Sequence, residues 1–176
     1  MLMPFSSNFI VNNIKLDIEV LPLVFMFTGI SSIIIMPLIG KLSDKVDKFK
    51  LFTAGSLLAC LMVLVYTNLG VSPLWQVVVI NMIMFMGIMG RVVPAQTLNS
   101  SIPEMTDRGA YMSINSSLQQ LAGGLGAMFA GLIVVNTGEK SPLQHFDTLG
   151  YIIIAIMIVC TFLMYRVSKM IKNKTR

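Results

Sequence analysis

Residues 51–90 read LFTAGSLLACLMVLVYTNLGVSPLWQVVVINMIMFMGIMG and contain no charged side chain. As one straight helix this stretch would be about 60 Å long, whereas the hydrocarbon layer of a membrane is about 30 Å thick. The stretch must therefore fold back on itself. The segment from Asn68 to Pro73 supplies the turn, since its Gly, Ser and Pro residues favour turns and let a new helix begin near Leu74. The pattern predicts two consecutive membrane-spanning helices.

The composition extends this prediction to the whole chain. Of its 176 residues, 55% are apolar and 12% are charged, whereas soluble domains have roughly 45–50% and about 25%. The two cysteines, Cys60 and Cys160, lie in apolar runs, and His145 is the single histidine. No metal-binding, redox or phosphate-binding motif is recognisable. We therefore expect an integral membrane protein that is not an enzyme, holds no metal or cofactor, and does not bind nucleic acid.

Three further apolar stretches are long enough to cross a membrane. The five predicted spans are about 20–39, 51–67, 74–94, 111–135 and 149–165. Segment 1–14 is too short for a span, and we interpret it as the outer end of a truncated helix that belongs to a longer protein. A short native chain is the alternative. Residues 15–176 are expected to form an all-α transmembrane bundle with a basic tail at 166–176.

Basic residues between the predicted spans indicate the orientation of the chain. Lys15 and Lys140 lie on one side of the membrane, and ten other basic residues lie on the opposite side. Because cytoplasmic connections are rich in Lys and Arg, this bias predicts a multi-pass protein of the cell inner (plasma) membrane, with a cytoplasmic C-terminus and Met1 outside. The ten residues are Lys41, Lys45, Lys48, Lys50, Arg108, Arg166, Lys169, Lys172, Lys174 and Arg176.

The connection after the first span carries a family resemblance. Residues 40–50 read GKLSDKVDKFK. This resembles the Gly-x-Leu-Ala-Asp-(Arg/Lys)-x-Gly-(Arg/Lys)-(Arg/Lys) signature that major facilitator superfamily transporters carry between the second and third helices of each six-helix half. Asp47 stands at the second glycine and Phe49 at a basic position. The matching positions are Gly40, Leu42, Asp44, Lys45 and Lys48.

Further stretches resemble sugar-efflux and drug-efflux members of that superfamily. They read PFSSN at 4–8, GRVVPAQ at 90–96, RGAYMS at 108–113 and SSLQQLAGGLG at 116–126. The resemblance implies half of a major facilitator fold, the carboxy-terminal half, with five complete transmembrane helices plus an N-terminal partial helix. It also implies part of a secondary active transporter that exports small molecules by alternating access, with an amino-terminal half as partner. A small non-transporting interaction subunit and a homodimeric transporter built from two copies stay open.

The resemblance implies a gate at the cytoplasmic ends of the helices. The predicted gating loop consists of Gly40, Asp44, Lys45 and Lys48. Charged hydrogen bonds at helix ends contribute about 1.5–3 kcal/mol each, which is enough to bias an equilibrium between two conformations. The alternative is that the lysines only determine topology.

Polar side chains within the spans are candidates for a substrate cavity. An arginine at the membrane centre costs about 2.5–3.5 kcal/mol, so Arg91 must face protein or water, either in a cavity or by reaching toward the interface. Asn115 and Gln119 share a helix face and form either a clasp between helices or part of a cavity. Asn81 and Thr28 are weaker candidates, because such groups often bond to their own helix.

Small residues recur at four-residue spacing on the predicted span 111–135. Gly123, Ala127 and Gly131 form one such row, and Gly126 belongs to the adjacent row. Rows of this kind let membrane helices approach closely. We therefore predict a helix-packing face on this span.

Overall fold

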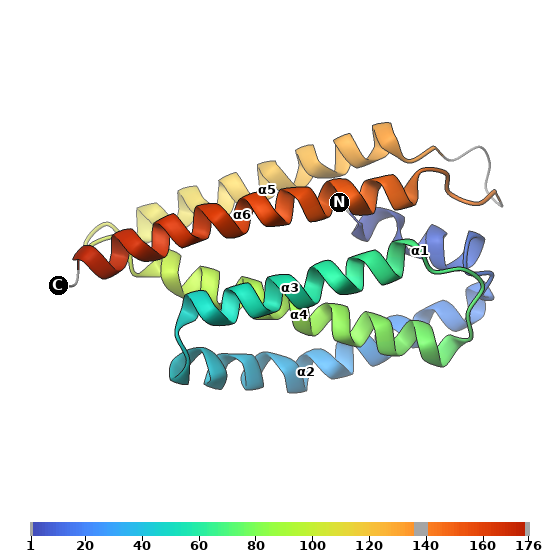
Figure 1. Cartoon of the computed structure of the whole chain (residues 1–176), viewed down its shortest axis with the longest axis horizontal. Helices are drawn as coiled ribbons and strands as arrows, with labels where there is room; N and C mark the ends of the chain where they lie inside the picture. Colours follow the sequence, from blue (N-terminus) through green and yellow to red (C-terminus); the bar gives the residue numbers. More distant parts are fainter. Residues whose placement is uncertain (1, 136–140, 175–176) are drawn as a thin grey trace.

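The computed structural model describes residues 2–135 and 141–174, which fold into helices joined by short connections (Figure 1). Among these residues the extended structure is limited to an isolated antiparallel bridge between Val135 and Gln144. Met1, Lys140 and Arg176, which contribute to the predicted topology, lie outside the described residues. The elements are α1 (Met3–Asn12), the short 3-10 helix η1 (Ile18–Val20), α2 (Leu21–Lys45), α3 (Lys48–Thr67), α4 (Leu74–Ser100), α5 (Arg108–Ile133) and α6 (Phe146–Lys174).

Four helical segments of the described chain are long and apolar enough to cross a membrane. They are Ile18–Lys45, Lys48–Thr67, Leu74–Ser100 and Phe146–Ile171. The 26-residue helix α5 has sufficient length but is not among them, because its Asn, Gln and Ser side chains lower its hydropathy. The ten residues of α1 cover only about 15 Å. The all-helical membrane architecture agrees with the sequence, whereas five complete spans stay a prediction.

The turn between α3 and α4 lies where the sequence places it. Helix α3 ends at Thr67 and α4 begins at Leu74, directly after Pro73. Helices α2, α4 and α6 continue beyond the C-terminal ends of the spans predicted for them. Helix α2 continues through Pro37 to Lys45, α4 through Pro94 to Ser100, and α6 to Lys174.

The expectation of a loop from Gly40 onward is therefore wrong for residues 40–45, which are helical. Only Val46 and Asp47 connect α2 to α3. After Gly40, residues 41–45 contain no Gly or Pro, and Lys and Leu are good helix formers. Because the backbone hydrogen bonds of a helix are satisfied internally, α2 can continue past the apolar layer.

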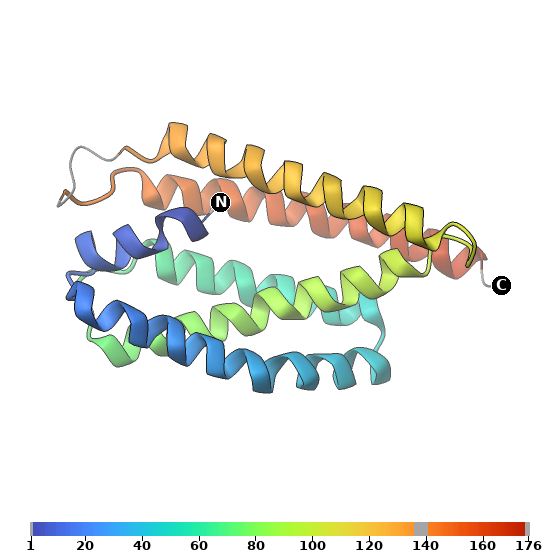
Figure 2. The ribbon, with the colours of Figure 1, turned by 180° about the vertical axis from the view of Figure 1, so that it is seen from behind.

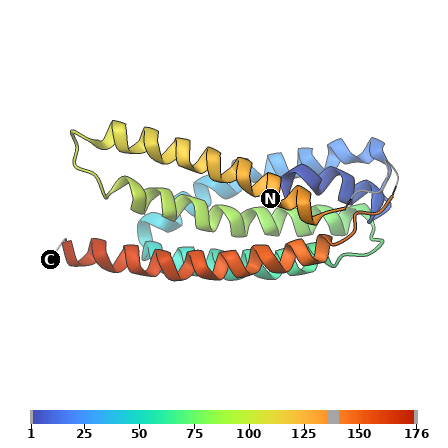
Figure 3. The same cartoon turned by 90° about the horizontal axis from the view of Figure 1, so that it is seen from above.

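Helix α4 occupies the centre of the lower layer in Figure 1 and packs against both α2 and α3, most extensively against α3. Helix α6 packs along α3 (Figure 1). Helix α5 makes few contacts with α6 and, seen from above, lies apart from it over most of its length (Figure 3). Seen from behind, α1 lies beside the start of α2, at the end of the bundle opposite the C-terminus (Figure 2).

The α2–α3 link, the α4–α5 connection and the C-terminus lie at the same end of the bundle (Figure 1). We call this end the basic end, because the described residues Lys41, Lys45, Arg108, Arg166 and Lys169 belong to it. The arrangement brings together the charges that the sequence assigns to one side of a membrane.

An aromatic cluster forms the core of the opposite end. Phe9 of α1 stacks on Phe146 of α6 with 4.1 Å between ring centroids, and Tyr66 of α3 lies 5.2 Å from Phe9. All three side chains are at most 2% exposed. The cluster therefore holds the ends of three helices together.

Near this cluster, the side chain of Asn13 forms two hydrogen bonds with the backbone of Leu143. Its Nδ2 donates to the carbonyl oxygen of Leu143 at 3.1 Å, and its Oδ1 accepts from the Leu143 amide at 2.8 Å. Two residues later, His145 is exposed and has a left-handed φ of 62°. Its carbonyl oxygen accepts from the Leu149 amide at the start of α6, so the backbone of His145 helps to begin that helix.

Helices α3 and α4 approach each other at glycines. A Cβ placed on Gly55 would lie 2.6 Å from the carbonyl carbon of Gly90, and a Cβ on Gly87 would lie 2.8 Å from the Ala59 nitrogen. Both obstacles are backbone atoms, which cannot rotate away. The two helices can pack this closely only while these positions lack a side chain.

Candidate functional site

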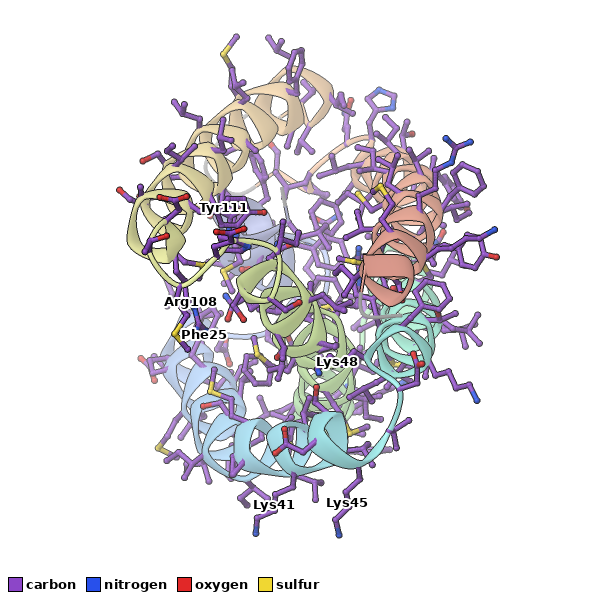
Figure 4. All side chains as sticks on the ribbon, turned by 90° about the vertical axis from the view of Figure 1, so that its left-hand side faces the viewer. Phe25, Lys41, Lys45, Lys48, Arg108 and Tyr111 are labelled. Atoms are coloured by element: carbon purple, nitrogen blue, oxygen red, sulfur yellow. The ribbon has the colours of Figure 1, made fainter. Side chains whose placement is uncertain are left out.

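The residues of the predicted gate lie on the last turns of α2 and at the start of α3. Asp44 and Lys45 are exposed, and Lys48 is half-buried. Lys41 and Lys45 point away from the bundle when it is viewed from the basic end (Figure 4). A Cβ on Gly40 would meet nothing within 4 Å. Asp44 forms no ion pair within the described part of the chain, so its carboxylate is available to a group outside this bundle.

Asp47 has a local structural role that the sequence comparison with the signature does not reveal. Its carboxylate oxygen Oδ1 accepts from the backbone amides of Phe49 at 2.9 Å and Lys50 at 3.4 Å. These bonds satisfy amides that have no acceptor within the first turn of α3. An Asp directly before a helical apolar run is a known start signal for a helix, and this signal identifies the role.

We expect Asp47→Ala to lower the free energy of unfolding by about 1 kcal/mol, because the cap of α3 is lost. Asp47→Asn keeps an oxygen acceptor and is expected to retain most of the stability. Thermal unfolding in detergent, followed by size-exclusion chromatography, measures the difference. The matched control is Asp44→Ala, which removes an exposed carboxylate three residues earlier and is expected to change stability by less than about 0.5 kcal/mol. Equal losses in both alanine variants would contradict the capping role.

Arg91 lies on α4 and is directed toward α3. Its guanidinium carbon lies 5.4 Å from the centroid of the Phe52 ring, which is a cation–π arrangement. Its Nε atom is buried without a hydrogen-bond partner in the described structure. The charge therefore packs against protein within the bundle, in agreement with the expectation that it cannot face lipid.

The other cavity candidates are distributed over three helices. Thr28 of α2 and Asn81 of α4 donate to carbonyl oxygens of their own helices, at 2.8 Å from Val24 and 2.9 Å from Val77 respectively. On α5, Asn115 is half-buried and Gln119 is exposed. No hydrogen bond links any two of these four side chains within the described residues. Their predicted cavity role stays a prediction.

The predicted packing face of α5 is open in this structure. A Cβ on Gly123 would meet nothing within 4 Å, and a Cβ on Gly131 would reach only the Phe5 ring at 3.9 Å. Gly126 and Ala127 are half-exposed. The face does not contact a neighbouring helix closely within the described chain, and its predicted role concerns a partner outside it.

The arrangement of four apolar spans with basic residues gathered at one end is typical of a multi-pass membrane protein. A family model described as Major Facilitator Superfamily matches residues 1–175. The chain belongs to the major facilitator superfamily. Proteins of this family are membrane transporters and not enzymes, so transport is the general function that membership indicates. No curated protein and no solved structure matches the chain.

In this member of the major facilitator superfamily, the sequence analysis did not identify the small residues at which α3 and α4 approach each other. The observed contact uses Gly55 and Ala59 of α3 with Gly87 and Gly90 of α4. Gly55 and Ala59 are four residues apart, which is the spacing that also singled out α5. The four-residue spacing is therefore present on α3 as well, but spacing alone does not indicate which row of small residues meets a neighbouring helix in a major facilitator protein.

Proposed function

We propose that the chain is the carboxy-terminal half of a secondary active transporter that exports small molecules such as sugars or drugs. In this proposal it lies in the cell inner membrane with its C-terminus in the cytoplasm, and it acts together with an amino-terminal half. The two halves enclose the substrate near the midplane and transport it by rocking against each other. The five-span topology, with α5 as a complete crossing, belongs to this proposal.

The exposure of α5 is the observation that carries the proposal. Ala130 is its one buried residue, and Gln119 and Gln120 are exposed with the apolar side chains around them. Lipid can cover exposed leucines, but polar amides in hydrocarbon need a protein partner or water. Helix α5 therefore has the character of a helix that faces a second half or a water-filled cavity.

We further propose that Asp44 and Lys45 form gating contacts with the amino-terminal half. Both are exposed at the end of α2, where a partner surface can reach them. Arg91 is the proposed charged participant in the transport cycle. Asn115 and Gln119 are the proposed polar lining of the cavity, with Asn81 and Thr28 as weaker members.

Reconstitution of the purified chain in liposomes tests the division into halves. We expect no accumulation of sugars or drugs above that of empty liposomes, because a single half holds only half of a cavity. Co-reconstitution with an amino-terminal half encoded upstream is expected to produce transport driven by an ion gradient. Within that two-chain system, Arg91→Gln is expected to reduce the transport rate at least tenfold.

The same experiment separates the proposal from its alternatives. Transport by the chain alone would overturn the half-transporter interpretation, and a cross-linked dimer through α5 in that preparation would indicate two copies. Absence of transport with a stably bound amino-terminal half would favour an interaction subunit. Full transport by Arg91→Gln would remove Arg91 from the mechanism.

A further inference from the structure

A groove runs along the seam between α3 and α6 toward the basic end. It has a volume of about 380 Å³, and its lining includes Leu57 and Cys60 of α3 and Ile158 and Phe162 of α6. The Ser and Thr hydroxyl groups in it are already bonded to carbonyl oxygens of their own helices. Ser56 donates to Phe52 at 2.8 Å, and Thr161 donates to Met157 at 2.8 Å. The groove therefore presents an apolar wall, which suits a hydrocarbon chain and not a polar solute.

A second cavity, of about 590 Å³, continues the groove into a basic mouth. It is lined by Arg166, Lys169 and Met170, and it shares Phe162 and Tyr165 with the groove. The lining residues of α6 recur three or four positions apart and so lie along one face of the helix. From Ile158 to Met170 this face is about 18 Å long, comparable with one leaflet of a hydrocarbon layer about 30 Å thick.

An aromatic contact across the seam and a cation–π contact within α6 lie at the mouth. The Tyr165 ring of α6 lies 5.5 Å from the Phe49 ring of α3, and the Arg166 guanidinium lies 5.6 Å from the Phe162 ring. Arg166 and Lys169 are both exposed, and neither forms an ion pair within the described part of the chain. Two cations without an acidic partner, placed at the end of an apolar groove, complement an anionic head group that carries a hydrocarbon tail.

We propose that the α3–α6 seam binds an anionic phospholipid of the leaflet at the basic end. One acyl chain lies in the groove beside Leu57 and Ile158, and the phosphate accepts hydrogen bonds from Arg166 and Lys169. Tyr165 lies between the two regions, where its ring contacts the chain and its hydroxyl reaches the head-group level. The inference depends on membrane insertion and not on the proposed transport function.

Tryptophan quenching by lipids with brominated acyl chains tests the proposal. The single native tryptophan, Trp75, lies in the first turn of α4 and is removed by the substitution Trp75→Phe. In the same chain, Leu57→Trp places a reporter in the groove. In nanodiscs we expect phosphatidylglycerol to be preferred over phosphatidylcholine at this reporter by at least about fivefold, the factor that one nearby basic residue contributes. The double substitution Arg166→Gln with Lys169→Gln is expected to reduce the preference to near one.

The control removes the same charge elsewhere on the basic end. Lys41→Gln with Lys45→Gln neutralises two exposed lysines of α2 and is expected to leave the preference at position 57 unchanged. An equal loss of the phosphatidylglycerol preference in both double variants would overturn the proposal. The attraction of anionic lipid would then come from the total positive charge of the basic end and not from the groove. If a double variant fails to fold, the native reporter Trp75 provides the comparison, since an equal preference at positions 75 and 57 would also overturn the proposal.

Discussion

Gly55→Val is expected to separate α3 from α4 and to lower the free energy of unfolding by about 3 kcal/mol or more. Overpacking of a well-filled contact costs about 1–3 kcal/mol and more where nothing can yield. At Gly55 the nearest obstacle is the Gly90 backbone, 2.6 Å from the first added carbon. Denaturation of the purified chain in bicelles by sodium dodecyl sulfate, followed by circular dichroism, measures the loss.

Gly29→Val is the matched control for this substitution. Gly29 lies within α2, and a Cβ there would meet nothing within 4 Å. Since Val has a somewhat higher helix propensity than Gly, the control is expected to be neutral or slightly stabilising. A similar loss of stability in both variants would mean that the close approach of α3 and α4 is not what holds them together.

Phe146→Ala is expected to cost about 3–5 kcal/mol, because it removes a buried ring and leaves a cavity. The ring is 2% exposed and stacks on Phe9 at 4.1 Å, so the substitution also removes an aromatic pair. The expected result is a large fall in unfolding temperature. Exchange of backbone amides in α1 is expected to increase, because Phe9 of α1 loses the ring on which it stacks.

Phe129→Ala provides the comparison for Phe146→Ala. Phe129 is 54% exposed on α5, so its truncation leaves no enclosed cavity. We expect a change below about 1 kcal/mol at this position. A loss at Phe129 as large as at Phe146 would show that α5 is packed against protein in the isolated chain, contrary to its exposure in this structure.

The sequence predicts the hairpin of α3 and α4 well, because length and turn chemistry determine it locally. An uncharged run of 40 residues cannot cross a membrane once, and the turn residues before Leu74 leave one place to reverse. The ends of α2 and α6 were less predictable. Hydropathy indicates where an apolar stretch ends, whereas a helix ends where its backbone hydrogen bonds end, and in α2 and α6 the two positions differ.

The pairing of helices could not be predicted from spacing. Rows of small residues occur on both α3 and α5, yet within the described chain only the α3 row lies against the backbone of a neighbouring helix. Which row is used depends on the relative rotation of whole helices, and that rotation results from the sum of many contacts. The charge of Arg91 likewise predicts that it faces protein or water, but not that Phe52 of α3 lies beside it.

The contact at Gly55 and Gly90 also has a mechanical consequence. Two backbones in contact cannot slide past each other without first moving apart. Helices α3 and α4 are therefore expected to move as one rigid body in any conformational change. Displacement has to be absorbed where packing is sparse. Places with few contacts are the two-residue link at Val46 and Asp47 and helix α5, so bending there is expected to cost little free energy.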